Sequence, residues 1–414
     1  MAKYTLAGAC AVLLAVLAML SGPETCAAEA FPAPEVYALA IDVDGGGTPE
    51  DDYARGTLSL SAPGGGLALQ TPVDIRLRGN TSRRFPKQGY RLRLMDGEGR
   101  KRKLSLCGLR TDDDWILNPM YSDTSKLREA LAYWLWEQIN SCGRAAAGSS
   151  VAWAEVWLNG EYLGLYGVQE RIDRKQVDAD RLAGILYKVS ANDVPSVQAL
   201  RQAGSAESCG GFELAFAGAA VERPWEPAAD YMALLTGEVP PGNARLSEAN
   251  AVDYALWSML TQARDNHFKN MYIHCAPDAG GGTLYRIPWD LNFTLGDRWD
   301  GNAEAANFVR YEVGEPALDD VARLRLEAGD EDFMAALKAR WAALRAGAIT
   351  EARLIGQATA LFEGLYPAIL RDTGRWPRCG MGEGSAANIR DIEDFFRQTL
   401  SNMDEWMANG VPLG

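Results

Sequence analysis

The chain has little histidine and lacks the short motifs of common hydrolases and zinc proteins. Its 414 residues include only His267 and His274, which excludes a zinc site built from three histidines. It contains no His-Glu-x2-His pattern and no Gly-x-Ser-x-Gly nucleophile elbow. His267 could contact substrate or phosphate, or serve as a hydrogen-bonding residue of its loop. His274 is expected to be an ordinary strand residue.

Positive charge is also scarce. The formal net charge of −14 argues against a nucleic-acid or anionic-membrane partner, because phosphate contacts demand a basic face. The one dense basic run, residues 100–103, lies next to Gly-rich turn residues and is predicted to be a solvated hairpin tip. None of the seven cysteines forms a Cys-x2-Cys pair, so a zinc ribbon or a dense disulfide scaffold is not expected. One or two disulfides would fit an oxidising compartment.

The one long apolar run lies at the start of the chain. Lys3 precedes the apolar residues 6–20, and a small-x-small cleavage site at 28–30 precedes Phe31. The run is shorter than the ~20 residues of a membrane span. It predicts a signal peptide over residues 1–30 and export to the periplasm, the cell surface or the medium, with no membrane span after cleavage. An uncleaved amino-terminal anchor is the alternative.

The first half of the chain is predicted to be β structure with one helix. Alternating apolar runs separated by Gly, Pro, Asp and Asn predict strands across residues 35–96. An apolar stripe predicts a helix from about Ser122 to Asn140, capped by Ser122 or Asp123. A hairpin should follow, because an Asn-Gly pair at 159–160 stands between alternating apolar runs.

The second half is predicted to be mainly helical. Residues 172–183 look helical, and 184–190 read as a strand. The stretch 191–247 is expected to be irregular, forming an insertion or substrate-facing loops. Residues 251–263 make a strong amphipathic helix, and residues 316–411 should be mostly helical.

Three acidic or amide side chains flank a second predicted hairpin, residues 271–289. Asp265 and Asn270 precede it, and Asp290 follows its second strand. Phosphoryl transfer to a hydroxyl needs an Asp to orient the nucleophile, an Asn for one metal ion and a second Asp for the other. The interval Asp265-x4-Asn270 is that of a kinase catalytic loop. The alternative is that these side chains only cap helices and shape turns, where both residue types are common.

The order of elements supports the first reading. A β-rich part with one helix, followed by a larger helical part, is the arrangement of protein kinases. We therefore predict an α+β, protein kinase-like bilobal fold. Its small lobe would span residues 31–170, and its larger lobe, residues 171–414, would carry the catalytic loop, the metal-binding hairpin and the insertion 191–247.

Several segments resemble the spore-coat protein H (CotH) family of atypical protein kinases. They are IRLRGNTSRRFPKQGYRLRL (75–94), WILNPMYSDTSKLREALA (115–132), VWLNGEYLGLYGVQERID (156–173), GILYK (184–188), DNHFKNMYIH (265–274) and YRIPWDLNFTLGD (285–297). In this order they cover roughly residues 70–300. The resemblance implies a kinase-like fold, binding of ATP with Mg²⁺ or Mn²⁺, and phosphorylation of protein hydroxyls.

Carried onto this chain, the resemblance implies that Asp265 positions the acceptor hydroxyl and that Asn270 and Asp290 bind the metal. Mg²⁺ prefers such oxygen donors and keeps phosphate oxygens and water as its other ligands. Asn292 and Asp297 lie near in sequence and could join them, or could simply belong to a turn.

Four more residues are candidates for binding the nucleotide. Arg78 and Lys87 flank residues 79–86, which could fold over the phosphates, since the chain has no Gly-x-Gly-x-x-Gly loop. For Lys87 the alternative is a charge at a strand edge. Lys188 is a candidate of the same kind. Glu170 falls where the two lobes would join and could meet the nucleotide.

Other prominent residues are predicted to be structural. Arg128 should stabilise its helix or pair with an acid. Trp289 should support the metal site, and four further tryptophans should lie in the core: Trp134, Trp136, Trp153 and Trp157.

The function expected from these observations is an exported kinase acting on Ser or Thr of a secreted or surface protein. Transfer of another group from ATP, such as adenylylation, remains open. A second alternative is a cell-surface adhesion or scaffold protein on an inactive kinase-like fold, because ATP is scarce outside the cytoplasm. A metal-dependent hydrolase would use similar carboxylates but would leave the small β lobe unexplained.

Overall fold

The computed structural model describes residues 31, 33–79, 81–297, 314–377 and 389–413. Residues 33–414 form one compact unit. The predicted signal peptide, residues 1–30, lies outside the described residues. Within the described part of the chain, no helix is long and apolar enough to cross a membrane.

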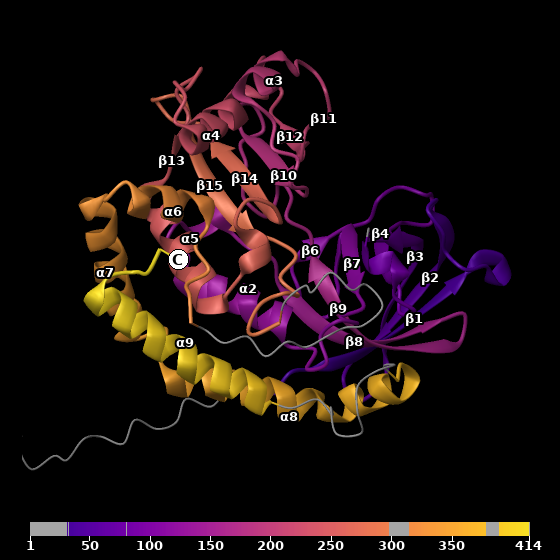
Figure 1. The fold of residues 1–414 in the computed structure, drawn as a ribbon. Coiled ribbons are helices and arrows are strands. Elements are labelled where there is room, and N and C mark those ends of the chain that lie inside the picture. Colours follow the sequence, from indigo (N-terminus) through magenta and orange to yellow (C-terminus); the bar gives the residue numbers. More distant parts are fainter. Residues whose placement is uncertain (1–30, 32, 80, 298–313, 378–388, 414) are drawn as a thin grey trace, which may run out of the picture. The chain divides into compact units, whose positions relative to one another are not determined.

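The N-terminal strands close into a barrel with the order β1-β2-β3-β4-β7-β9-β8 (Figure 1). The strands are β1 (Val36–Val43), β2 (Ala54–Ser61), β3 (Leu67–Arg78), β4 (Gly89–Leu94), β7 (Asp114–Asn118), β8 (Val151–Leu158) and β9 (Glu161–Glu170). Parallel pairing of β1 with β8 closes the barrel. The connections hold the short elements η1 (Asp44–Gly46), η2 (Thr81–Arg84), β5 (Leu104–Ser105) and β6 (Thr111–Asp112).

The barrel has its own hydrophobic core. Alternate residues of each strand are buried, such as Leu39 and Ile41 on β1 and Leu92 and Leu94 on β4. This period of two is the one that places every second side chain inside a barrel. The predicted β structure over residues 35–96 and the hairpin with its Asn-Gly turn at 159–160 are therefore confirmed.

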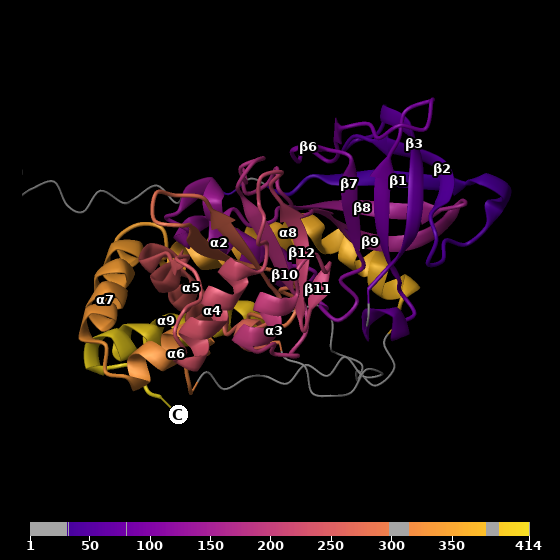
Figure 2. The ribbon, with the colours of Figure 1, turned by 90° about the horizontal axis from the view of Figure 1, so that it is seen from above.

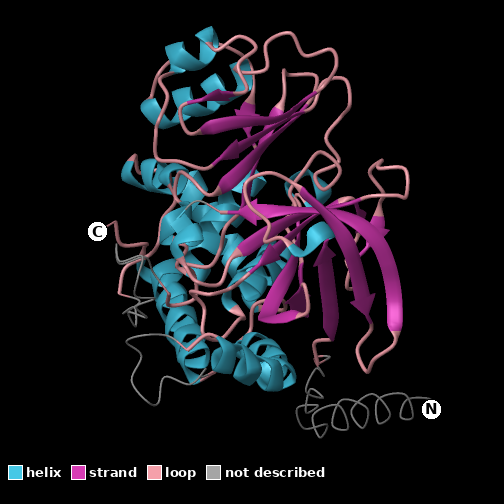
Figure 3. Ribbon diagram, turned by 90° about the vertical axis from the view of Figure 1, so that its right-hand side faces the viewer, coloured by secondary structure: helices cyan, strands magenta, loops and turns pink. Residues whose placement is uncertain are grey.

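A second sheet has the order β11-β12-β10-β14-β15-β13. Its strands are β10 (Ile185–Val189), β11 (Ser208–Cys209), β12 (Phe212–Ala217), β13 (Arg245–Leu246), β14 (Met271–Ala276) and β15 (Thr283–Pro288). β14 and β15 pair antiparallel, which confirms the second predicted hairpin. Figure 3 shows the barrel strands and this sheet as two separate groups.

Most helices follow or flank the second sheet. They are α2 (Arg128–Ile139), α3 (Val197–Gln202), α4 (Glu226–Thr236), α5 (Glu248–Thr261), α6 (Asp320–Glu327), α7 (Glu331–Arg345), α8 (Glu351–Arg375) and α9 (Arg390–Asn409), with the short turns η3 (Gly143–Ala146) and η4 (Arg264–Asn266). Figures 1 and 2 show α8 running along the barrel, where it contacts β9. The order of a β-rich part and then mainly helices confirms the α+β class.

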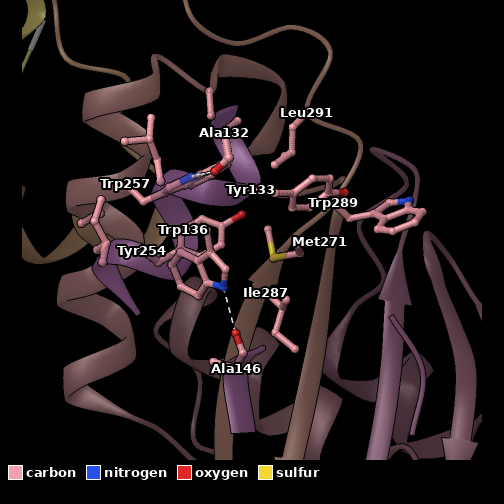
Figure 4. Packing of buried hydrophobic residues seen from close by; sticks show 14 of the residues in the cluster. Ala132, Tyr133, Trp136, Ala146, Tyr254, Trp257, Met271, Ile287, Trp289 and Leu291 are labelled. Atoms are coloured by element: carbon pink, nitrogen blue, oxygen red, sulfur yellow. Dashed lines mark hydrogen bonds between the residues drawn. The ribbon is translucent and has the colours of Figure 1, made fainter. Parts of the chain in front are cut away.

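Aromatic side chains join α2 to α5 in a second hydrophobic core (Figure 4). The ring of Trp136 meets Tyr254 and Trp257 edge-on, with ring centroids 5.8 and 6.1 Å apart. The indole N–H of Trp257 donates to the carbonyl of Ala132, and that of Trp136 to the carbonyl of Ala146. The helix predicted for the small lobe therefore packs its side chains with the later helices and the second sheet.

The predicted core role of the tryptophans holds to different degrees. Trp136 and Trp153 are buried, whereas Trp134 and Trp157 are half-buried.

The basic run at 100–103 is exposed at a turn, as expected. The cysteines of the described residues, Cys107, Cys142, Cys209 and Cys275, are free thiols, and Cys379 lies outside the described residues.

The prediction of a helix over residues 172–183 is wrong, because this segment forms consecutive turns. The carboxylate of Asp173 accepts hydrogen bonds from the backbone N–H groups two and three residues later, and Asp180 does the same. Asp178 adopts a left-handed φ of 52°. Asp side chains that bond the following backbone compete with helix formation in this way.

Two further segments differ from expectation. The stretch 191–247 is ordered and contains α3, α4 and three strands of the second sheet; its aromatic residues Phe212 and Trp225 pack on Tyr187. Helix α2 begins only at Arg128, because Lys126 has a left-handed φ of 61°.

Candidate active site

The loop between α5 and β14 carries the first two predicted site residues. It leaves the helix through η4, and Asp265 lies in that turn. Asn270 ends the loop with a left-handed φ of 54°, directly before β14 begins. Asn adopts this conformation more readily than most residues because its short amide can bond locally.

The structure brings Asp265 and Asn270 into direct contact. The amide Nδ2 of Asn270 donates to Oδ2 of Asp265 over 2.7 Å. Oδ1 of Asp265 forms an ion pair with Nζ of Lys269 at 2.9 Å, and both side chains are partly exposed. Both carboxylate oxygens are therefore held by residues of the same loop. The sequence reasoning overlooked Lys269, although its position four residues after Asp265 was a visible signal.

Asp290 lies beside this loop, two residues after β15 ends. Met271 and Pro288 are paired across the hairpin, and the N–H of Trp289 donates to the carbonyl of Asn270 over 2.9 Å. Asp290 is exposed and has a left-handed φ of 61°. Among the described residues its carboxylate has no hydrogen-bond partner, so it is available to a ligand.

The buried side-chain amide of Asn266 joins the loop that carries Asn270 to the segment that carries Asp290. Nδ2 of Asn266 donates to the carbonyls of Asn270, at 2.7 Å, and of Trp289, at 2.8 Å. Its own backbone carbonyl accepts a hydrogen bond from the hydroxyl of Tyr254 on α5. The sequence reasoning did not single out Asn266, because a lone loop Asn carries no distinctive signal.

Helix α2 contributes a buried carboxyl next to Asp290. Burial raises the pKa of Glu129 to about 7, and the negative charge of Asp290 adds to this effect. Glu129 accepts hydrogen bonds from the side-chain amides of Asn118 and Gln169. The carboxyl thus belongs to a polar cluster with the barrel residues Asn118 and Gln169, and the charge of Asp290 acts on it.

Arg78, one of the predicted phosphate-binding residues, lies next to the segment that carries Asp290. Its guanidinium lies 5.7 Å from the ring centroid of Trp289, the residue before Asp290. Trp289 is itself buried and meets the ring of Tyr272 edge-on at 5.5 Å. The cation therefore lies at the end of β3, beside the segment after β15 that carries Asp290.

Two more arginines approach the second sheet from the barrel. Burial raises the pKa of Tyr272 to about 12, and the nearby positive charges of Arg171 and then Arg78 oppose this rise. Arg171 and Arg91 share the carboxylate of Asp114, with Nη1 of Arg171 2.6 Å from Oδ2. A local positive cluster thus exists within an acidic chain.

The residues Asn270 and Asp290 fit a metal ion that binds together with a nucleotide. Among the described residues, no group of three or more His, Cys, Asp or Glu side chains could hold a metal by itself. Asn270 and Asp290 offer an amide oxygen and a carboxylate on two segments that the hydrogen bond from the N–H of Trp289 to the carbonyl of Asn270 joins. Mg²⁺ is commonly held by one or two such protein ligands, with substrate phosphates and water completing its octahedron.

Comparison with known families agrees with this geometry. The family model described as CotH kinase protein matches residues 75–403, which is most of the chain. The chain belongs to the CotH kinase family. Membership implies a kinase, and hence ATP and a substrate that accepts the phosphoryl group. A search of curated proteins found no match.

In this CotH kinase, Lys188 lies on the same face of the second sheet as Tyr272. The two residues face each other in the register of β10 and β14. Nζ of Lys188 pairs with Glu213 at 3.5 Å, and the side chain remains partly exposed. The residue is thus near the cluster around Tyr272, and its role in nucleotide binding stays a prediction.

Lys87 has a different environment. Its side chain is 0% exposed, and Nζ forms an ion pair with Asp372 of α8 at 2.5 Å and donates to the carbonyl of Leu165. Asp372 also pairs with Lys126 at 3.0 Å. These contacts join the barrel to α8 and compensate the buried charge. The proposed alternative, a strand-edge charge, does not describe so buried a group.

Glu170 is also engaged by protein groups. Its carboxylate accepts the backbone N–H of Arg110 over 3.0 Å and lies 3.4 Å from the amide of Gln176. Burial raises its pKa, and these hydrogen bonds and the charge of Arg110 partly offset the rise. Its placement at the end of β9 is as expected, whereas contact with a nucleotide stays a prediction.

The remaining candidates have structural contacts. Asp123 accepts the backbone N–H of Arg128 over 2.8 Å and pairs with its guanidinium at 2.7 Å, which confirms the acid partner predicted for Arg128. The N-cap position of α2 is Leu127, so neither Ser122 nor Asp123 occupies the cap position that the sequence predicted. The amide of Asn292 donates to the hydroxyl of Ser122. Asp297 is buried and its charge acts on Arg128. His267 has a pKa lowered by burial.

Proposed function

We propose that this CotH-family chain is an exported protein kinase that transfers the γ-phosphate of ATP to Ser or Thr hydroxyls of secreted or surface proteins. The observation that carries the proposal is the hydrogen bond between Asp265 and Asn270 on a loop whose end is bonded to the residue before Asp290, with Arg78 beside that residue. Protein kinases place the same three residue types around the transferred phosphate.

The fold supports the proposal. The barrel and the second sheet, with its helices, have separate hydrophobic cores, which corresponds to the two lobes of a kinase-like arrangement. The proposed site would draw on both groups of strands, because Arg78 at the end of a barrel strand lies beside Trp289, which precedes Asp290. A binding-only scaffold would not need a free Asp290 carboxylate beside an Asp–Asn pair.

The residues would act as follows. Asp265, oriented by Asn270 and Lys269, would accept a hydrogen bond from the substrate hydroxyl and take its proton as the oxygen attacks. Asn270 and Asp290 would hold the metal ion, which neutralises charge on the phosphate oxygens when bound. Arg78 would stabilise negative charge on the nucleotide from the barrel side.

Export is part of the same proposal and rests on the sequence of residues 1–30. Their short basic start, apolar run and small-residue cleavage site are those of a signal peptide. An acceptor on a secreted or surface protein would then be reached in the same compartment.

Labelling with radioactive ATP tests the proposal. The protein is incubated with Mg²⁺ or Mn²⁺ and casein as a generic acceptor, once with label in the γ-phosphate and once in the α-phosphate. Label from the γ position alone, lost in Asp265→Ala and Asp290→Ala, is the expected result. Label from the α position would indicate adenylylation instead. Equal labelling by wild type and both variants would exclude this site.

A further inference from the structure

Two of the proposed metal-side residues have strained backbones. Asn270 and Asp290 both lie in the left-handed region, with φ of 54° and 61°. For residues other than glycine, this conformation costs on the order of 1 kcal/mol and persists only where the surroundings impose it. Something in the structure must therefore hold these two residues in place.

Asn266 contacts the peptide group that follows Asn270 and the peptide group that precedes Asp290. The carbonyl of Asn270 belongs to the peptide that follows it, so its orientation sets ψ of Asn270. The carbonyl of Trp289 belongs to the peptide that precedes Asp290, so its orientation sets φ of Asp290. Both carbonyls accept hydrogen bonds from the single Nδ2 of Asn266, at 2.7 and 2.8 Å.

The Asn266 side chain is shielded from water, and its main chain is hydrogen-bonded to α5. Asn266 is 1% exposed, and its main chain is fixed by the Tyr254 hydroxyl at 3.1 Å. Tyr254 is also buried, with its ring 4.3 Å from the guanidinium of Arg286 on β15. Arg286 in turn forms a fully buried ion pair with Asp319, which caps α6. The position of Asn266 therefore depends on a chain of contacts through α5, β15 and the start of α6.

We infer that Asn266 is a positioning residue for the metal site: its side-chain amide fixes the separation and direction of Asn270 and Asp290. The inference rests on the proposed function, because those two residues must be the metal ligands. An amide is required at this place. A carboxylate would repel both carbonyls, and an apolar side chain would leave them buried without these donors.

The test measures metal dependence as well as activity. Wild type and Asn266→Ala are compared for Mg²⁺ half-saturation of phosphate transfer and for the rise in melting temperature given by ATP at increasing Mg²⁺. Loss of a group that orients metal ligands typically lowers metal affinity 10–100-fold. We expect the half-saturating Mg²⁺ concentration of Asn266→Ala to rise by about 10-fold or more in both assays.

A matched control separates this effect from loss of stability. Asn159 likewise binds two backbone groups, accepting from the N–H of Val43 and donating to the carbonyl of Gly47, but it lies in the barrel hairpin. Asn159→Ala should lower the melting temperature without changing the Mg²⁺ half-saturation. If Asn266→Ala does not fold, Asn266→Ser replaces it, since a hydroxyl can donate one hydrogen bond where the amide donates two.

The outcomes are distinct. A folded Asn266 variant with wild-type Mg²⁺ half-saturation would overturn the positioning role while leaving the kinase proposal intact. A rise confined to the metal-dependent readouts, with the effect of ATP in EDTA unchanged, would support it. If wild type itself shows no metal-dependent response to ATP, the proposed function fails and the positioning role fails with it.

Discussion

At the scale of single residues, the site depends on small groups with more than one partner. Asp265 uses one oxygen for Asn270 and the other for Lys269, so its orientation is set before any substrate binds. Preorganised groups of this kind cost no rearrangement during the reaction. Replacing any of the three should therefore affect turnover more than folding.

Lys269→Met should lower the turnover number by about 10²-fold, because the Asp265 carboxylate loses its ion pair and the site loses a cation. Lys269→Arg should recover part of the activity. Lys101→Met is the matched control, since Lys101 is an exposed lysine paired with Asp113 on the barrel. Steady-state labelling rates at saturating ATP give the comparison, and equal losses in the two Met variants would contradict a role for Lys269.

The raised pKa of Glu129 predicts that the free energy of unfolding depends on pH. Its pKa is about 7 in the folded protein, against 4.5 as the ordinary value, so the folded state binds the extra proton between these values. The contribution of Glu129 to stability is therefore fully present below about pH 4.5, falls as pH rises and levels off above about pH 7. The full range is up to ~3 kcal/mol.

The measurement is urea unfolding of wild type and Glu129→Gln from pH 5 to pH 8. The difference between the two free energies of unfolding should shift in favour of Glu129→Gln as pH rises. Asp290→Asn should reduce the shift, because the charge of Asp290 contributes to the raised pKa. A difference that does not vary with pH would refute this account of Glu129.

At the scale of elements, a buried carboxylate joins the last long helix to the barrel. Asp372 of α8 pairs with Lys87 and Lys126, and its Oδ1 accepts the N–H of Leu165 on β9. Gly164 makes this approach possible. It has φ of 101°, and a Cβ there would lie 2.2 Å from Oδ1 of Asp372.

Asp372→Ala should destabilise the protein by about 3–5 kcal/mol, because it leaves buried lysine charges without their shared partner. Gly164→Ala should also destabilise, through the steric clash and the strained φ. Arg371→Ala is the control, since Arg371 is an exposed neighbour on α8 that pairs with Glu155. Chemical denaturation gives the free energies, and a loss for Asp372→Ala no larger than that of the control would argue against the buried network.

The ion pair between Lys87 and Asp372 allows the role of Lys87 to be tested. A nucleotide-binding lysine and a structural lysine respond differently to a paired change. Replacing both partners, as in Lys87→Met with Asp372→Leu, should restore part of the stability lost in either single variant. Retained metal-dependent binding of ATP by that double variant would assign Lys87 to structure alone.

At the scale of the whole molecule, the described chain has two hydrophobic cores, and the proposed site draws residues from both groups of strands. The barrel contributes arginines, and the second sheet with its helices contributes the acidic corner. Free thiols at the described cysteines mean that the described fold has no disulfide.

Export predicts a defined mature end. Expression of the full chain in a bacterial host should give a secreted or periplasmic product whose first residue is Phe31, because cleavage follows the small residue Ala30. Intact-mass and amino-terminal analysis of the fractionated product gives the answer. A product that keeps residues 1–30 in the membrane fraction would instead indicate an uncleaved anchor.

The sequence by itself determined the local features. Alternating apolar residues specified the barrel strands, Asn-Gly specified one hairpin, and the amphipathic run specified α5, because periodicity and turn chemistry act over short distances. The spacing of Asp265, Asn270 and Asp290 across the second hairpin placed the candidate site, since a hairpin brings its two ends together.

Only the tertiary structure decided which distant groups meet. It paired Lys87 with Asp372, set Arg171 and Arg91 on Asp114, and placed Asn266 beneath Asn270 and Trp289. It also replaced the helix expected at 172–183 by turns, because Asp carboxylates there bond the backbone. Contacts between residues far apart depend on how the sheets and helices pack, and no local pattern encodes that packing.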